Sequence, residues 1–184
     1  MNHPQSNSFL IADPFLKDNS FKRSVVYLCA HNDEGSYGFV LNKKTDYLLT
    51  DLIPDLETKM RIPVFTGGPV GLDTIHFLHQ LPDLIPDGLQ LNDQLYWGGD
   101  FNIMKNILID AQANLNKIKF FIGYSGWSAG QLNTELDEKT WLISKADNDI
   151  IFNTSEEKIW KKSIKLLGPG FEELINYPID PELN

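Results

Sequence analysis

The strongest constraint on the fold is a pair of β-branched and aromatic segments separated by a short polar loop. Residues 23–31 and 37–42 flank the loop 32–36, which contains Gly35. A loop of this length with a glycine is typical of a β-hairpin. The first third of the chain is therefore predicted to consist mainly of strands. The other predicted strands cover residues 8–12, 63–66, 75–80, 119–123, 141–145 and 149–153.

Amphipathic helices are predicted mostly in the second half of the chain. Asp100 is in position to cap a helix whose apolar residues share one face. Capping-box patterns precede two further helices, at residues 128–131 and 154–157, and the second of these helices is predicted to end at Gly168. A short helix is predicted within residues 48–56. Because the strands cluster instead of alternating regularly with helices, we predict an α+β fold with a mixed, largely antiparallel sheet.

The composition is that of one globular domain, predicted to span residues 1–184. The formal net charge of −9 repels nucleic-acid phosphates and anionic lipid headgroups, so neither direct nucleic-acid binding nor membrane binding is expected. Cys29 is the single cysteine and cannot form an intrachain disulfide. The first apolar cluster, residues 9–12, is too short for the core of a signal peptide. We therefore expect a cytoplasmic protein.

Ser125 suggests one enzymatic interpretation. Residues 123–126 lie between a predicted strand and a predicted helix, which is the setting of a nucleophile elbow. That motif requires a small fifth residue, however, and Trp127 occupies the position. The histidines that could serve as a base all precede the serine: His31, His76 and His79. A tight turn is the preferred interpretation, and a hydrolase or other enzyme with an unfamiliar site near Ser125 and these histidines is the alternative.

Neither a metal site nor a phosphate loop is predicted. His76 and His79 are three residues apart on a predicted strand, so their side chains should point to opposite faces. Cys29 and His31 share a strand face, but no second pair completes a four-ligand set. The segment Gly67-Gly68-Pro69 lacks the ending of a P-loop, and its proline removes a backbone N–H group. We predict a structural turn there, and no cofactor.

A row of lysines on the last predicted helix is the best local candidate for nucleic-acid binding. The row consists of Lys158, Lys161, Lys162 and Lys165. Glu156 and Glu157 open the same helix, and no aromatic residues interleave with the lysines. A solvated helix face explains the pattern better than a nucleic-acid interface.

The strongest candidate for a binding surface surrounds the bulky residues Tyr124 and Trp127. Free N–H groups at the start of the following helix can bind a carboxylate or a phosphate, and aromatic rings beside them can hold a ligand. In the competing interpretation, Ser128 caps the helix, Gly126 adopts a conformation that disfavours side chains, and both rings enter the core. The candidate surface comprises Tyr124, Ser125, Gly126, Trp127, Ser128, Gly130 and Gln131.

Motifs in a fixed order along the chain resemble the AlgH/YqgE family of bacterial proteins. The match covers about residues 8–168, which leaves 1–7 and 171–184 as expected tails. Two residues depart from the family pattern: Lys44 replaces a usual proline, and Asn133 replaces a frequent glutamate for which Glu135 is a partial stand-in. The matching segments are 9–14 (FLIADP), 21–26 (FKRSVV), 31–35 (HNDEG), 38–43 (GFVLNK), 65–70 (FTGGPV) and 123–132 (GYSGWSAGQL), followed by Trp141-Leu142, Phe152, Trp160 and Leu167-Gly168.

The resemblance implies a fold and a general role more than a chemistry. Members form a pseudo-barrel of bent antiparallel sheet with flanking helices, and the family is named for a proposed role in regulating alginate production. No established catalytic residues come with it. We therefore expect a non-enzymatic binding or regulatory protein that acts through a protein or small-molecule partner, whose identity and oligomeric state the sequence leaves open.

Overall fold

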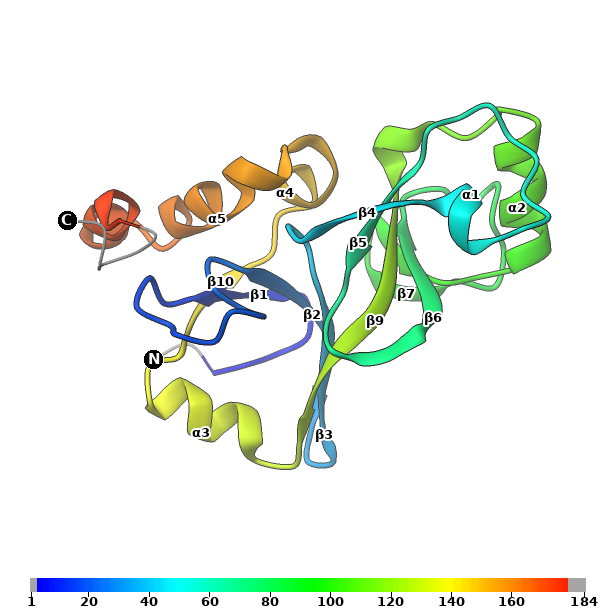
Figure 1. Cartoon of the computed structure of the whole chain (residues 1–184). Helices are drawn as coiled ribbons and strands as arrows, with labels where there is room; N and C mark the ends of the chain where they lie inside the picture. Colours follow the sequence, from blue (N-terminus) through cyan, green and yellow to red (C-terminus); the bar gives the residue numbers. More distant parts are fainter. Residues whose placement is uncertain (1–2, 179–184) are drawn as a thin grey trace.

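The computed structural model describes residues 3–178 and contains one bent sheet with helices packed on it (Figure 1). The main strand order is β10-β1-β2-β3-β9-β6-β8-β7, with β4 paired to β5 and β5 paired to β9. All pairings are antiparallel except the parallel pair β5–β9. The predicted α+β class with a mostly antiparallel sheet is therefore confirmed, and the sheet stays open. The strands are β1 Ser8–Ala12, β2 Val25–Asn32, β3 Gly35–Val40, β4 Lys44–Leu48, β5 Pro63–Thr66, β6 Val70–His79, β7 Leu89–Asn92, β8 Leu95–Trp97, β9 Ile118–Ser128 and β10 Trp141–Lys145.

The predicted helix after Asp100 is present. The Asp100 carboxylate caps it by accepting a hydrogen bond of 2.9 Å from the Ile103 N–H group. The predicted strand at residues 149–153 is wrong. Asp147 accepts a hydrogen bond from the N–H group of Asp149 and starts a helix there, and this local cap overrides the β-branched residues. The helices are α1 Leu49–Leu52, α2 Phe101–Ile109, α3 Gln131–Asp137, α4 Asn148–Asn153 and α5 Glu156–Lys165, with 3₁₀ helices η1 Leu115–Lys117 and η2 Pro169–Asn176.

The C-terminal helices differ from the prediction in three details. Ser155 occupies the N-cap position of α5, but its side chain makes no capping hydrogen bond. The helix ends at Lys165, before Gly168, whose φ of 98° redirects the chain into η2. Residues 171–176, expected in a tail, belong to η2, and Leu174 and Ile175 pack against the core.

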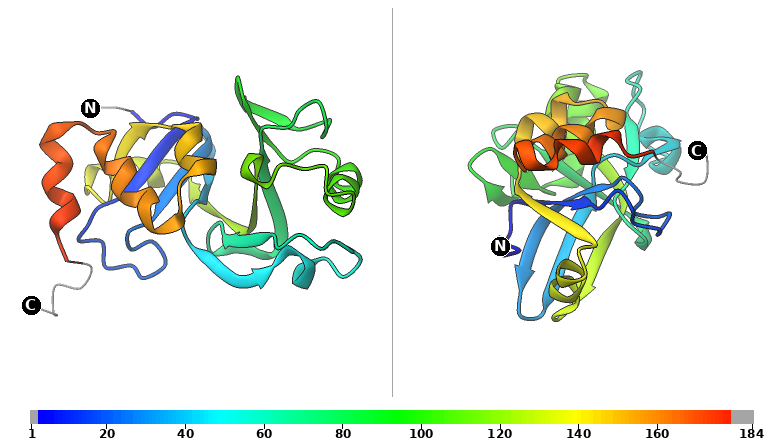
Figure 2. Two further views of the ribbon diagram at one scale, coloured as in Figure 1. Left: turned by 90° about the horizontal axis from the view of Figure 1, so that it is seen from above. Right: turned by 90° about the vertical axis from the view of Figure 1, so that its left-hand side faces the viewer.

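The molecule has two halves that share β9 (Figure 2). In the first half, a core cluster that includes Phe9, Tyr27 and Trp160 lies between the sheet and the helices α4 and α5, and α3 covers the opposite face through Leu132. In the second half, Met104 of α2 packs on a separate cluster with β5 and β6. β9 pairs with β5 and β6 near its start and with β3 near its end. Within residues 3–178, no helix combines the length and the apolar character that crossing a bilayer requires.

A buried lysine connects the start of β9 to α4. The Lys119 ammonium donates a hydrogen bond of 3.3 Å to the carbonyl oxygen of Ile151 and lies 4.1 Å from the centroid of the Phe65 ring. Burial lowers the pKa of Lys119 to about 7, although the carboxylate of Glu156 acts in the opposite direction. A titratable amine therefore lies against the first core cluster at the place where α4 covers β9.

Candidate functional site

The positive φ angle of Gly123 changes the face to which the following residues of β9 point. Phe121 belongs to the first core cluster and Tyr124 packs against the same cluster, although residues three apart on a regular strand point to opposite faces. Gly123 has a φ of +64°, and a Cβ atom there would lie 2.7 Å from the carbonyl oxygens of Gly68 and Val70. Only glycine fits this position. After it, Tyr124 and Gly126 face one side of the sheet, while Trp127 enters the cluster under α3.

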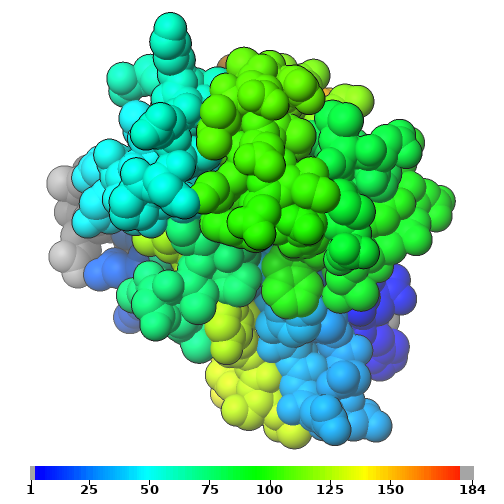
Figure 3. Space-filling view, turned by 90° about the vertical axis from the view of Figure 1, so that its right-hand side faces the viewer, coloured from blue at the N-terminus to red at the C-terminus, as the bar shows by residue number. Residues whose placement is uncertain are grey.

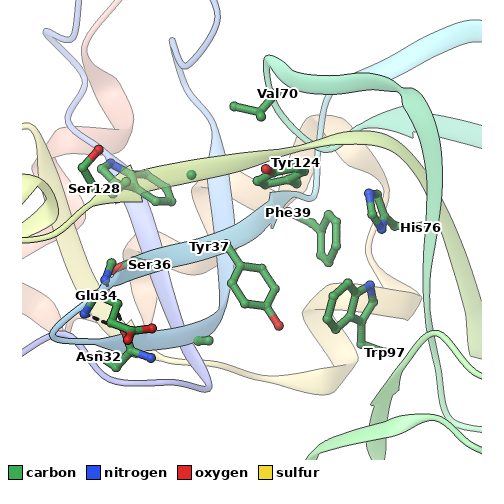
Figure 4. A pocket seen from close by; sticks show the side chains of 14 residues that line it. Asn32, Glu34, Ser36, Tyr37, Phe39, Val70, His76, Trp97, Tyr124 and Ser128 are labelled. Atoms are coloured by element: carbon green, nitrogen blue, oxygen red, sulfur yellow. Dashed lines mark hydrogen bonds between the residues drawn. The ribbon is translucent and has the colours of Figure 1, made fainter.

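A groove of about 760 Å³ runs along the face of β3 and β9 to which Tyr124 belongs (Figure 4). We call it the β3–β9 groove. Seen from the side of the second half, the end of the β3–β9 ribbon projects beyond β6 to β8 (Figure 3). Aromatic rings close one end of the groove, and small and polar residues of the hairpin line the other end. The lining residues are Ala30, Asn32, Glu34, Gly35, Ser36, Tyr37, Phe39, Val70, His76, Trp97, Tyr124, Gly126, Trp127 and Ser128.

The aromatic end is built by residues from four strands, and we call it the aromatic wall: Tyr37, Phe39, His76, Trp97 and Tyr124. Ring centroids are 5.2 Å apart for Tyr37 and Trp97, 5.9 Å for Trp97 and His76, and 6.0 Å for His76 and Tyr124. Phe39 is fully buried behind them, and the other four rings are partly exposed. Partly exposed aromatic rings that line a groove are available to a ligand.

On the opposite face of the sheet, Trp127 of β9 and Trp141 of β10 are buried and hydrogen-bonded. The indole N–H groups of Trp127 and Trp141 each donate a 2.8 Å hydrogen bond to Oε2 of Glu135 in α3. The side-chain amide of Gln131 donates to Oε1 of the same carboxylate at 3.0 Å. Only 6% of Trp127 and 3% of Trp141 is exposed to solvent. The Glu135 carboxylate thus serves as the polar centre of a structural cluster.

The predicted junction before α3 is partly wrong. β9 continues to Ser128, so the N-cap residue of α3 is Gly130, which has a φ of 75° and no side chain with which to cap. The Ser128 hydroxyl therefore does not cap the helix, whereas its backbone N–H group donates to Oε1 of Gln131 at 3.0 Å, the reciprocal half of the predicted box. Gly126 is not among the residues with positive φ, so the strain predicted there occurs at Gly123. Gly126 is exposed in the groove.

Ser125 does not form a nucleophile elbow. It lies in the middle of β9, only 1% of its surface is exposed, and its hydroxyl donates to the carbonyl oxygen of Gly67 at 3.0 Å. That hydrogen bond ties the strand to the predicted turn Gly67-Gly68-Pro69, which connects β5 to β6. An added Cβ atom at Gly68 would lie 2.3 Å from the carbonyl carbon of Tyr124, so the turn requires glycine where the two backbones meet.

Each of the three histidines of the enzymatic alternative has a hydrogen-bonding partner of its own. Nδ1 of His31 lies 2.7 Å from the Ser36 hydroxyl, and Nε2 of His76 lies 3.0 Å from the hydroxyl of Thr74. His79 is fully buried: its Nδ1 accepts from a backbone N–H group, so its Nε2–H group donates to the Gly98 carbonyl oxygen at 3.0 Å. Burial lowers the pKa of both His76 and His79. Among the described residues, no group of three or more His, Cys, Asp or Glu residues could hold a metal ion.

The four lysines of the predicted basic row are exposed on α5, opposite its buried residues Ile159, Trp160 and Ile164. One of them, Lys162, donates a hydrogen bond to the Thr154 hydroxyl at 3.0 Å. The row lies on the C-terminal helix of the first half and contributes no residue to the β3–β9 groove.

The groove is lined by some residues of the predicted binding surface and by others that were not predicted to belong to it. Of the predicted surface, Tyr124, Gly126, Trp127 and Ser128 line it, whereas Ser125, Gly130 and Gln131 do not. Sequence reasoning missed Tyr37 and Trp97, which reach the groove from β3 and β8. No local pattern could have joined them, because their proximity depends on β3 and β6 pairing with β9 and on β8 pairing with β6.

The fold is that of the small α+β proteins in which one bent, mostly antiparallel sheet carries flanking helices, and in this chain the sheet also carries the β3–β9 groove. Residues 9–172 match the family described as AlgH-like. The chain belongs to this family, as the resemblance of its motifs implies.

Relatives of known sequence and structure cover nearly the whole chain. A UPF0301 protein of Parabacteroides distasonis is 44% identical, over 98% of this chain and 92% of that protein. Another UPF0301 protein, from Cytophaga hutchinsonii, is 39% identical over 95% and 96% of the two chains. The solution structure of the AlgH protein from Pseudomonas aeruginosa superimposes with a TM-score of 0.75 at 28% identity, covering 97% of each chain. A crystal structure of a Corynebacterium diphtheriae protein shares the fold, with a TM-score of 0.76 at 18% identity over 96% and 94% of the two chains.

Proposed function

We propose that this protein is a non-enzymatic binding protein of the bacterial cytosol and that its ligand occupies the β3–β9 groove. The aromatic wall is the observation that supports the proposal, because it leaves four partly exposed rings in a concave site. A groove of about 760 Å³ lies in the size range of small-molecule sites. The neighbouring Gly126 and Ser128 leave room for a ligand beside the rings.

The regulatory role that the family resemblance suggests would then depend on the bound ligand or on a protein partner, without direct contact to DNA. The net charge of −9 opposes the sequence-independent affinity on which DNA binders depend. A mobility-shift titration at low salt against a library of duplex sequences tests this part. A sequence-selective complex at submicromolar protein concentration would show that it is wrong.

The structure gives the hydrolase alternative little support. The Ser125 hydroxyl donates to a backbone carbonyl and is shielded from solvent, and the three histidines have partners of their own. An attacking serine needs a base within hydrogen-bonding reach and space for a substrate carbonyl. We therefore place the binding site at the aromatic wall and not at Ser125.

A fragment titration followed by two-dimensional NMR tests the proposed site. We expect apolar and aromatic fragments to shift the signals of Gly126 and of the Trp97 indole in the wild-type protein. Tyr124→Leu should abolish these shifts while the protein remains folded. Tyr47→Leu is the matched control, because Tyr47 is 54% exposed on β4 and outside the groove. Fragments that shift only signals outside the groove would overturn the proposal.

A further inference from the structure

We infer that the β3–β9 groove binds a small organic molecule that carries a quaternary ammonium group, with this cation placed against the aromatic wall. The inference rests on the proposed function and names the class of its ligand. It follows from the order of the rings, from the charges that line the groove and from the polar groups beside the wall.

The aromatic wall presents a continuous row of π-systems. Tyr37, Trp97, His76 and Tyr124 form successive neighbours, with centroid separations from 5.2 to 6.0 Å, and all four are partly exposed. Tyrosine and tryptophan faces attract cations that lie within about 6 Å of the ring centroid. One small cation at the wall can therefore contact more than one ring. A wall of aliphatic side chains would bury the same apolar surface without this attraction.

The charges of the groove favour a cation and oppose an anion. Among the residues that the structure describes, no lysine or arginine lines the groove, and the one carboxylate in its lining is that of Glu34, near the hairpin tip (Figure 4). The whole chain has a net charge of −9, which attracts cations at long range. A phosphate or carboxylate ligand would find no positive partner in this lining.

The imidazole of His76 does not disturb this balance at neutral pH. Burial lowers its pKa, so the ring in the wall is neutral. Its Nε2 atom is within 3.0 Å of the Thr74 hydroxyl, which holds the ring in place beside Trp97. The wall therefore carries no competing positive charge where the ligand would bind.

The ammonium group should be quaternary because the wall offers few acceptors. A primary ammonium carries three N–H donors that need partners when they are desolvated. Glu34 lies toward the hairpin tip, with Tyr37 between it and the other rings of the wall (Figure 4). A quaternary ammonium has no N–H group to satisfy and can be bound by aromatic faces alone. The Glu34 carboxylate then attracts the ligand cation mainly at long range.

The test compares choline with its neutral isostere 3,3-dimethylbutan-1-ol, which has the same shape without the charge. Both compounds are titrated into the full-length protein and followed by NMR at Gly126 and the Trp97 indole. We expect choline to bind roughly tenfold more tightly than the isostere, the ratio that a moderate cation–π contribution gives. Equal affinities would overturn the inference and leave the proposed function standing, because the groove would still bind ligands without preferring a cation.

Variants separate the role of the wall from that of the fold. Trp97→Leu and Tyr124→Leu should each remove the preference for choline, whereas Tyr47→Leu should keep it. Glu34→Gln, an exposed change that leaves folding intact, should weaken choline binding about twofold at low salt and not at high salt. Glu57→Gln is its control in an exposed loop outside the groove. The inference fails if the choline preference survives both wall variants, or if neither compound shifts groove signals at millimolar concentration.

Discussion

The last residues of β9 carry aromatic rings on both faces of the sheet. The two faces differ in how far their rings are buried and hydrogen-bonded. On the α3 face, the indoles of Trp127 and Trp141 are buried and share the carboxylate of Glu135. On the groove face, Tyr124 stands beside His76, and among residues 3–178 no helix covers it. The difference separates structural rings from available ones. The rings on the α3 face are buried and hydrogen-bonded within the fold, whereas those on the groove face remain partly exposed.

The largest expected change in stability comes from a comparison in which one ring is removed from each face. Trp127→Ala should lower the free energy of unfolding by roughly 3–5 kcal/mol, because it leaves a cavity under α3 and an unused acceptor on Glu135. Tyr124→Leu should cost about 1 kcal/mol or less, because the ring is partly exposed and leucine keeps apolar contacts. Denaturant melts of both variants provide the measurement. Equal losses would mean that the groove face is as structural as the α3 face.

Removal of the shared acceptor comes next in size. Glu135→Ala leaves the indole N–H groups of Trp127 and Trp141 without their partner, and we expect a loss of about 2–3 kcal/mol. Glu135→Gln keeps a carbonyl oxygen in place and should lose clearly less. Glu138→Ala, an exposed change at the end of the same helix, is the control. If Glu135→Ala melts like the wild type, water replaces the carboxylate and the cluster is not held by it.

A pair of glycines separates strain in the backbone from space in the groove. Gly123→Ala should destabilise the protein by about 1–3 kcal/mol, because its φ is positive and the new methyl group would meet two carbonyl oxygens. Gly126→Ala should stay within about 0.5 kcal/mol of wild type, because its nearest contact is one ring edge of Tyr124 at 3.3 Å. The same variant should reduce fragment binding. If thermal melts show a larger loss of stability for Gly126→Ala than for Gly123→Ala, the change of face assigned to Gly123 is wrong.

The last prediction concerns the pH dependence of stability at the covered start of the same face, where α4 lies over Lys119. The pKa of Lys119 is about 7 in the folded protein and near 10.4 in an unfolded chain, so unfolding takes up a proton between these pH values. Stability should therefore rise with pH across this window, by at most about 1.4 kcal/mol per pH unit from this residue. Lys119→Met should flatten the rise, and Lys161→Met, on the exposed side of α5, should not. Urea melts from pH 7 to 10 measure the slope, and an unchanged slope in Lys119→Met would contradict the prediction.

The features predictable from the sequence were those encoded by neighbouring residues. The hairpin at residues 32–36 followed from its glycine loop, and the helix after Asp100 followed from its cap and its apolar face. The helix at residues 148–153 was missed because one Asp147 side chain outweighed a β-branched run. In a segment this short, one side-chain hydrogen bond can decide between helix and strand.

The groove was only half predictable for a different reason. Tyr124 was identified because it belongs to a distinctive local motif, but Tyr37 and Trp97 belong to unremarkable stretches and reach it through strand pairing. Trp127 was placed in the same candidate surface because the strand was predicted to end at residue 123, whereas β9 continues to Ser128. The positive φ of Gly123 cannot be read from a sequence rich in glycine, since every glycine there permits it.

The shared strand also bears on how the chain can fold while it is being synthesised. β1 to β8 are complete by residue 97, yet β3, β5 and β6 all find their common partner in residues 118–128. Until that segment has left the ribosome, β5 and β6 have no strand between them and β3 has one open edge. Exposed edges of this kind are where nascent chains associate wrongly. For most of its synthesis, the nascent chain therefore carries unpaired strand edges that only residues 118–128 can cover.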